Sequence, residues 1–307
     1  MQTNQDQTNE MLYRRDLYII TARTNMHVGS GDEAYGLVDN RVQRDVVTKL
    51  PNINASGLKG ALREYFSDKW GDKAQEVIEI FGSDSFEKTA PGEKKIHQAG
   101  AFRFFNANLL AIPVRSNIKP FFRATSPHVV ADLIDMMDTF GYPDEQGIKE
   151  HLRQLAALKP EKGKAFGFDS TVKDAVLEDY EYTVVGHELA GDVVTVIKSI
   201  IGDNPVLMND GDFMDICDDY HLPLIARNCL ENGRSTNIWH EQVVPRESRF
   251  YFFLLKPPGS TYDLEFSKGE PVQIGGNASI GYGFTRIDKI DDLITGLSNP
   301  RPMEKKP

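Results

Sequence analysis

HVGSGDEAYGLVDNRVQRDVVTKLPNINASGLKGALR, residues 27–63, joins a glycine-rich turn, an isolated carboxylate, a basic run and the expected start of a helix. The isolated carboxylate is Asp39. Beyond it, residues 41–63 contain five cations against a single acid, Asp45; the cations are Arg41, Arg44, Lys49, Lys59 and Arg63. A cationic strip beside a lone carboxylate predicts a site that holds a polyanion and can cut it.

A strand is expected before this stretch and a helix at its end. Residues 17–22 (LYIITA) are β-branched and aromatic, which predicts a central strand. The strand runs into the glycine turn at residues 29–31, where backbone can approach a ligand closely, although a plain chain reversal is the more frequent role of such a turn. Ser56 is expected to cap the helix. Lys59 and Arg63 then share a face near its start, where they either bind an anion or form a solvent-facing stripe.

Alternating strands and helices follow. Residues 100–114 predict one bent strand or two strands, with Arg115 and Ser116 directly after them. Ser126 and the following proline open a helix, and a second helix is expected over residues 145–158. This alternation, with antiparallel signals in the second half, favours a single α+β domain over residues 13–290. Residues 1–12 and 291–307 are expected to be a disordered and a polar tail.

Residues 224–246 predict a β-hairpin around an Asn-Gly turn. Arg227 and Trp239 lie in its arms among polar residues, so both faces cannot be core and the hairpin is expected to project. A buried strand is predicted after it, at residues 250–255.

A second glycine-rich run, VQIGGNASIGYGF (residues 272–284), includes Gly275, Gly276 and Asn277. It lacks the Gly-Lys-Ser/Thr ending of a P-loop, which argues against a nucleoside triphosphate site. Exposed backbone amides can still line a phosphate chain, so this loop is a candidate contact for a polyanion.

Composition excludes several classes of protein. With 307 residues, 40% hydrophobic and 26% charged, the chain is globular, without a stretch that suits a membrane span or a signal peptide. Its two cysteines form no CxxC pair and fit a reducing cytoplasm. Its seven histidines show no metal-ligand spacing, which argues against an unrelated metal hydrolase.

The net charge of −10 is concentrated in one segment. Residues 169–220 contain thirteen Asp and Glu against two Lys, a local charge of −11. Since the whole chain carries −10, the remainder is close to neutral at +1, so a basic face elsewhere is possible. The acidic segment is either a solvated face or a dock for a basic partner.

Seven motifs, in order, make the chain resemble the RAMP superfamily of CRISPR proteins, most closely the repeated backbone subunit of type III-B (Cmr) effector complexes. The motifs are HVGSGD, GLVDNRVQRD, NASGLKGALR, FGSD, GAFRFFNANLLAIPVRS, NIWHEQVVPRESRFY and QIGGNASIGYGF. The resemblance implies a ferredoxin-like, RRM-like palm with an inserted helical and acidic region (about residues 169–220) and a projecting β-hairpin thumb.

The resemblance also implies a function. Copies of the chain would stack along a guide RNA, and the thumb would disturb guide–target pairing at regular intervals, where a loop aspartate cuts the target RNA with a divalent metal, Mg²⁺ or Mn²⁺. Implied partners are guide RNA, target RNA, further copies, a small helical subunit and a large signalling subunit. The aspartate of GLVDN matches Asp39, the expected metal ligand, and His27 and Glu241 match the other candidate catalytic positions.

The candidate RNA-binding residues are Arg41, Arg44, Lys59, Arg63, Arg115, Ser116, Arg227, Trp239, Gly275, Gly276 and Asn277. Two roles stay open. His27 either acts on RNA or packs the turn, and Glu241 is expected to support the site from a neighbouring copy. The thumb also departs from the usual pattern, because His240 and Gln242 flank Glu241 where an aromatic residue and a second glutamate are common. A non-cleaving scaffold and a guide-processing endoribonuclease remain the alternatives.

Overall fold

The computed structural model describes residues 13–30, 38–83, 98–169, 172, 174–179, 181–231, 234–267 and 269–298. The expected tail at residues 1–12 lies outside them. At the centre are four antiparallel strands in the order β14 (Phe284–Lys289), β1 (Arg14–Ala22), β12 (Arg249–Lys256) and β4 (Ala107–Arg115). Helix α2 (Ala55–Trp70) lies between β1 and β4 in the chain. This is the strand order of a ferredoxin-like sheet, and it confirms the predicted α+β class.

The second crossover of this core, from β12 to β14, differs from the ferredoxin-like pattern. Its described residues form β13 (Val272–Gln273) and the short 3₁₀ helix η2 (Ala278–Ile280), where an α-helix would be usual. The glycine-rich run therefore occupies the place of a crossover helix, beside the end of β1.

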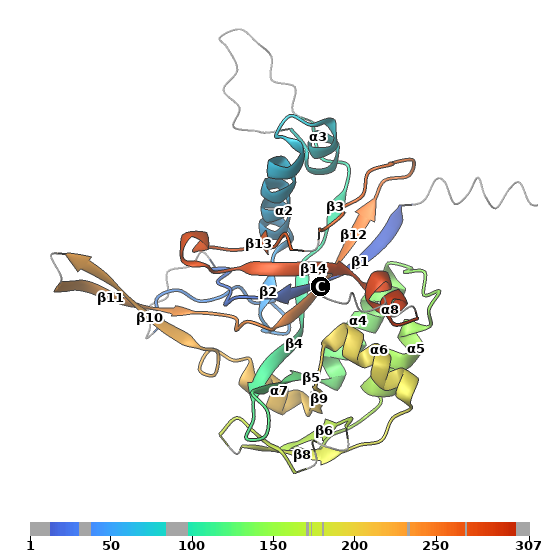
Figure 1. The fold of residues 1–307 in the computed structure, drawn as a ribbon, viewed down its shortest axis with the longest axis vertical. Helices are drawn as coiled ribbons and strands as arrows, with labels where there is room; N and C mark the ends of the chain where they lie inside the picture. Colours follow the sequence, from blue (N-terminus) through green and yellow to red (C-terminus); the bar gives the residue numbers. More distant parts are fainter. Residues whose placement is uncertain are drawn as a thin grey trace, which may run out of the picture.

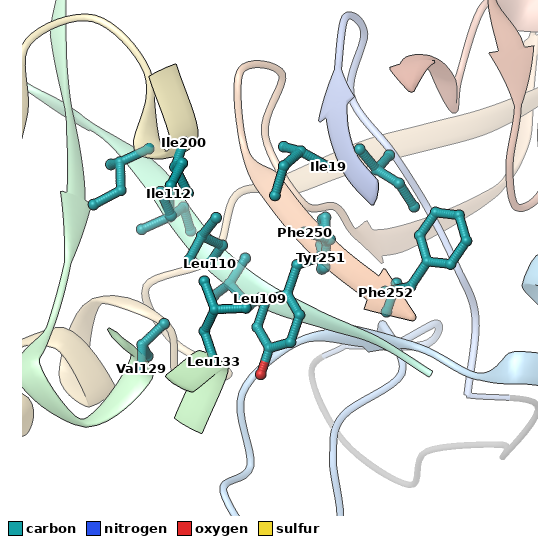
Figure 2. Packing of buried hydrophobic residues seen from close by; sticks show 14 of the residues in the cluster. Ile19, Leu109, Leu110, Ile112, Val129, Leu133, Ile200, Phe250, Tyr251 and Phe252 are labelled. Carbon is teal, nitrogen blue, oxygen red and sulfur yellow. The ribbon is translucent and has the colours of Figure 1, made fainter. Parts of the chain in front are cut away.

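The central position predicted for the first strand is confirmed. β1 pairs with β12 on one side and β14 on the other, and its last seven residues are buried. The aromatic strand β12 is buried along almost its whole length, as predicted for residues 250–255. Figure 2 shows Leu109, Leu110 and Ile112 of β4 between the β12 side chains and those of the helices.

A long insertion between β4 and β12 extends the same sheet. Strands β5 (Phe121–Thr125), β9 (Pro205–Met208), β6 (Lys164–Gly167), β8 (Tyr182–Gly186) and β7 (Val176–Leu177) continue it in that order. Helices α4 (Pro127–Thr139), α5 (Ile148–Ala156), α6 (Gly191–Ile201) and α7 (Asp210–Ile216) belong to the same insertion. The acidic region predicted as the insertion is thus only part of one that runs from residue 116 to residue 248.

Two helix boundaries test the sequence reasoning. Ser126 caps α4 as predicted, because its side chain accepts a hydrogen bond from Val129 N. The prediction for α2 was wrong by two residues, since Asn54 is the N-cap and Ser56 lies inside the helix. The first free amide, Ala55 N, donates to the Asn106 side chain at 2.8 Å, so a distant residue fixes this helix start.

The C-terminal tail prediction is wrong where the chain is described. Residues 290–298 form helix α8 (Ile290–Ser298), with Ile290 and Ile294 buried. Shorter elements complete the fold: β2 (Asn52–Ile53), α3 (Gln75–Phe81) and β3 (Arg103–Phe104). None of the helices in the described ranges is both long and apolar enough to cross a bilayer.

β10 (Leu224–Glu231) and β11 (Arg234–Gln242) form a separate two-stranded sheet. Figure 1 shows this hairpin, in orange-brown, extending away from the body of the protein. Most described residues of β11 are exposed, and only its last two, Glu241 and Gln242, are buried. We call this element the projecting hairpin.

Candidate nucleic-acid interface

Asp39 lies at the base of the projecting hairpin. Its carboxylate Oδ2 accepts a hydrogen bond from the backbone N–H of His240 at 2.7 Å, while the backbone N–H groups of Asp39 and Asn40 donate to the His240 carbonyl at 3.1 and 3.3 Å. The Asn40 carbonyl accepts from Gln242 N at 2.9 Å, so the loop runs along β11 as a short parallel bridge. Asp39 is nevertheless exposed. The carboxylate is therefore fixed in position and open to solvent.

Glu241 is buried in the same chain as Asp39, with 3% of its surface exposed. Its carboxylate accepts from Asn277 Nδ2 at 2.9 Å and from Arg227 Nη1 at 3.1 Å. His27 Nε2 lies 3.7 Å from Glu241 Oε1, and His27 Nδ1 donates to the Gln242 carbonyl at 2.8 Å. We call Glu241, Arg227, Asn277 and His27 the Glu241 node. Within its own chain Glu241 is thus bonded to residues of other segments, and its expected support of a site in a neighbouring copy stays a prediction.

The Glu241 node also uses side chains that were expected to bind RNA. Arg227 bonds Glu241 and lies 5.4 Å from the centre of the Trp239 ring. Asn277 gives its amide to Glu241 and adopts a left-handed backbone, φ +66°. His27 is 8% exposed. In this conformation the side chains of Arg227, Asn277 and His27 hold protein segments together. The ring of Trp239, on the hairpin, stays partly exposed.

The second glycine-rich run, residues 272–284, packs on the turn after β1, and we call it the glycine loop. Gly276 N donates to the His27 carbonyl at 2.8 Å. A Cβ added at Gly275, whose φ is +93°, would lie 2.4 Å from the same oxygen. Glycine is required here for backbone-to-backbone contact, and the Gly276 amide is already occupied, so this loop does not offer that amide to a phosphate.

Arg41 and Arg44 bind the acidic segment of their own chain. Arg41 Nη1 and Arg44 Nε each lie 2.9 Å from a different oxygen of Asp219. Arg44 also donates to the carbonyls of Lys49 and Cys217, at 2.8 and 2.6 Å. Because Gln242 Nε2 donates to the Asp219 carbonyl as well, this contact ties the basic strip, the acidic segment and the hairpin base together.

Arg115 is likewise paired with carboxylates of its own chain. Its guanidinium contacts Glu178 and Asp179 at 2.8 and 2.9 Å, and the hydrogen bond with Glu178 raises the pKa of Arg115. The neighbouring Ser116 forms a bridge with Leu177. Part of the acidic segment therefore docks on basic side chains of its own chain, a third possibility that the sequence reasoning had not considered.

Lys59 and Arg63 share one face of α2, as predicted. Lys59 Nζ lies 5.9 Å from the centre of the Phe104 ring, and Arg63 Nη1 donates to the Gly82 carbonyl at 2.9 Å. Partial burial, with the nearby charge of Arg63, lowers the pKa of Lys59. Within the described ranges neither cation has a carboxylate partner, so both charges stay electrostatically uncompensated, in contrast to those of Arg41, Arg44 and Arg115.

The metal expected at Asp39 can be tested against the residues present. No cluster of three or more His, Cys, Asp or Glu suited to a metal occurs among the described residues. Magnesium is commonly held by one or two carboxylates together with substrate phosphates and water. One exposed, immobilised carboxylate fits that arrangement, in which a bound phosphate and water would supply the remaining oxygens.

Three residues at this site were missed by sequence reasoning as site residues. His240 anchors Asp39 through its backbone, Asp219 pairs with two arginines, and Gln242 accepts from Val42 N at 3.2 Å. The charge of the acidic segment was a usable signal for Asp219, whereas backbone bonding of His240 leaves no signature in its residue type.

The family model of the RAMP superfamily matches residues 19–286. The CRISPR system Cmr endoribonuclease Cmr4 of Pyrococcus furiosus is 27% identical over 298 residues, covering 90% of this chain and 94% of the relative. A chain of the type III-B Cmr-beta complex bound to cognate target RNA has a TM-score of 0.74 at 22% identity, covering 92% of this chain and 99% of that one. Oligomeric Cmr4 from Pyrococcus furiosus gives 0.62 at 19% identity, covering 91% and 98%.

The solved structures share the fold described above, and the motifs quoted from the sequence fall inside the matched range. Since the family model spans most of the chain, this protein belongs to the RAMP superfamily.

Proposed function

We propose that this chain is the repeated backbone subunit of a type III-B CRISPR effector complex, and that it binds guide RNA and cleaves complementary target RNA at regular intervals. The observation that carries the proposal is the carboxylate of Asp39, exposed yet fixed to the base of a projecting hairpin. The similarity to a Cmr endoribonuclease and to chains of Cmr complexes supports it.

RNA contains its own nucleophile, the 2′-hydroxyl, so cleavage needs that oxygen in line with the scissile phosphorus. A-form pairing prevents this alignment, and a hairpin wedged into the guide–target duplex releases it locally. Positioning of this kind can supply several kcal/mol. Because the Asp39 loop is bonded to the hairpin base, the wedge and the carboxylate move as one unit.

Asp39 is suited to orienting a divalent ion rather than to deprotonating the 2′-hydroxyl, because an ordinary exposed carboxylate is a poor general base near neutral pH. A divalent ion held by Asp39 and the target phosphate would lower the pKa of the 2′-hydroxyl and neutralise the developing charge. The chain's own task is then to hold that carboxylate still beside the opened step of the duplex.

Guide RNA binding is assigned to Lys59 and Arg63 at the start of α2. They contact phosphate without reading sequence, as a subunit that accepts any guide requires. Further copies of the chain, a small helical subunit and a large signalling subunit are the proposed protein partners.

The test is Asp39→Ala in the complex assembled on a guide RNA. The proposal expects unchanged target binding and complete loss of the evenly spaced products. Unchanged cleavage would refute it and leave a scaffold subunit, the second candidate, which is favoured by the structural use of Glu241 and His27. EDTA added to the wild-type complex tests the metal separately, since products that persist at the same rate would exclude it.

A further inference from the structure

We propose that the Glu241 node fixes the angle of the projecting hairpin and thereby selects the phosphate that Asp39 reaches. Glu241 is then a positioning residue. The part about cleavage position rests on the proposed function, whereas the part about hairpin angle does not.

Among the described residues, the contacts that attach the hairpin to the body gather at its base. β10 and β11 pair only with each other among the named strands, in a sheet separate from the main one. At its base, backbone bonds join Val243 N to the Pro223 carbonyl at 3.0 Å and Val244 to Met26 at 2.8 and 2.9 Å, and the loop at Asp39 and Asn40 is bonded to β11 as described above. These backbone bonds lie close together at one point of attachment, so side-chain contacts at the same base help to decide the direction of the hairpin.

Glu241 is the charged side chain placed to decide it. Two of its partners belong to the body, Asn277 from the glycine loop and His27 from the turn after β1, and the third, Arg227, lies on β10 of the same hairpin. A tilt of the hairpin separates the carboxylate from Asn277 and His27 and leaves Arg227, which moves with the same hairpin, as its remaining partner. Losing hydrogen bonds to a buried charged group is unfavourable, so the node resists the tilt.

The same tilt would move Asp39. The Glu241 side chain binds the body, and the preceding residue, His240, holds Asp39 through its backbone N–H and carbonyl. The direction of the hairpin and the position of the carboxylate are thus set by adjacent residues of one strand. Changing the node should displace the carboxylate relative to the target, without removing it.

A direct chemical role for Glu241 fits less well. Both carboxylate oxygens accept hydrogen bonds within the chain, and 3% exposure leaves no access to a phosphate. Asp39, one residue along the bridge and exposed, is the carboxylate that RNA can reach.

The angle is measured by spin-label distances. Cys229 on β10 is exposed and accepts a label, whereas Cys217 is buried, and burial raises the pKa of its thiol, so it stays unlabelled. The second label is placed at Glu64→Cys on the exposed side of α2. The wild type should give one narrow distance distribution, which Glu241→Gln and Asn277→Ala should broaden.

Asp16→Asn is the matched control. Asp16 is also a buried carboxylate, paired with Lys256 and Lys289 at 2.6 and 2.7 Å, but it lies at the start of β1, away from the hairpin. Its removal should leave the distribution narrow. Asn277→Ala removes no charge, so it reports on the node even where Glu241→Gln fails to fold.

The position of cleavage is read on a target RNA at nucleotide resolution. The two node variants should bind target normally and cut at shifted or several adjacent phosphates, while Asp16→Asn keeps the wild-type position. A narrow distribution of spin-label distances in both node variants, together with unshifted cleavage products, overturns the inference. So does complete loss of cutting with a narrow distribution, which would make Glu241 part of the chemistry. If the wild type itself does not cut, the proposed function fails, and the distance measurement alone decides the hairpin angle.

Discussion

The carboxylate of Asp39 accepts a hydrogen bond from the backbone N–H of His240, 201 residues later in the chain, at 2.7 Å. The bond gives an exposed side chain one preferred orientation. It also separates two roles of Asp39, since the contact needs only an acceptor oxygen, whereas an ion or a developing charge needs the negative charge.

Asp39→Asn should therefore keep the loop and lose the reaction. The amide oxygen can still accept from His240, so the melting temperature and target affinity should match the wild type. Cleavage should fall at least about 100-fold, the range found when one electrostatic group of a catalytic site is removed. Single-turnover cleavage and a thermal melt on the same sample measure both. A matching fall in melting temperature would mean that the charge is structural.

Lys59→Gln should reduce the salt dependence of guide binding. Lys59 has no carboxylate partner in the described ranges, so its charge is available to a phosphate. The slope of log K against log salt should drop by about 0.7 for each single-strand phosphate that the protein no longer neutralises. The control is Lys149→Gln, because Lys149 is already paired with Asp138 at 2.8 Å. Equal slopes for wild type and Lys59→Gln would make this residue part of a solvated stripe.

Asp219→Ala should destabilise the protein more than it affects RNA binding. It leaves the largely buried Arg44 and the half-exposed Arg41 without their shared carboxylate. Because the pair is partly exposed, the expected loss is about 1–3 kcal/mol in the free energy of unfolding, below that of a fully buried pair. Urea denaturation measures it. Asp215→Ala, an exposed residue of the same segment, should change stability by less than about 0.5 kcal/mol.

The sequence predicted the order of the central elements well, because burial and periodicity are local properties. The apolar run of β1, the Ser126 cap of α4 and the polar arms of the hairpin each carry their own signal. Helix α8 also had a sequence signal, which the prediction of a polar tail overlooked: Ile290, Leu293 and Ile294 recur at helical spacing.

The partners of the charged residues could not be predicted in the same way. Arg41, Arg44 and Arg115 look free in the sequence, and their carboxylates lie between 63 and 178 residues away. A basic run shows only that cations are close together; the fold decides which of them are already neutralised. Asn277 was likewise predicted to contact RNA. Its bond to Glu241 depends on a left-handed turn, which the sequence alone does not reveal.

The contact between His221 and Asp218 should make stability depend on pH. The hydrogen bond between His221 Nδ1 and Asp218 Oδ1, 2.9 Å long, raises the pKa of His221. A raised pKa means that the contribution is fully present below the unfolded value of about 6.5 and is lost as pH rises through the folded value. The stability difference between wild type and His221→Gln should thus be present near pH 5.5 and absent at alkaline pH. Asp218→Asn should remove the same contribution, and a difference that grows with pH would contradict the assignment.

Gly275→Ala should be among the most damaging glycine substitutions in the glycine loop. Both Gly275 and Gly281 have positive φ, +93° and +84°, so alanine at either one costs about 1–2 kcal/mol in backbone strain. Of these two glycines, Gly275 is the one where the new Cβ meets backbone, 2.4 Å from the His27 carbonyl, whereas nothing lies within 4 Å of it at Gly281. Since that carbonyl also accepts from Gly276, relieving the clash moves the turn that supports Glu241. Urea denaturation should show a loss of about 3 kcal/mol or more for Gly275→Ala. Equal losses for the two variants would mean that strain alone, and not close contact with His27, requires glycine here.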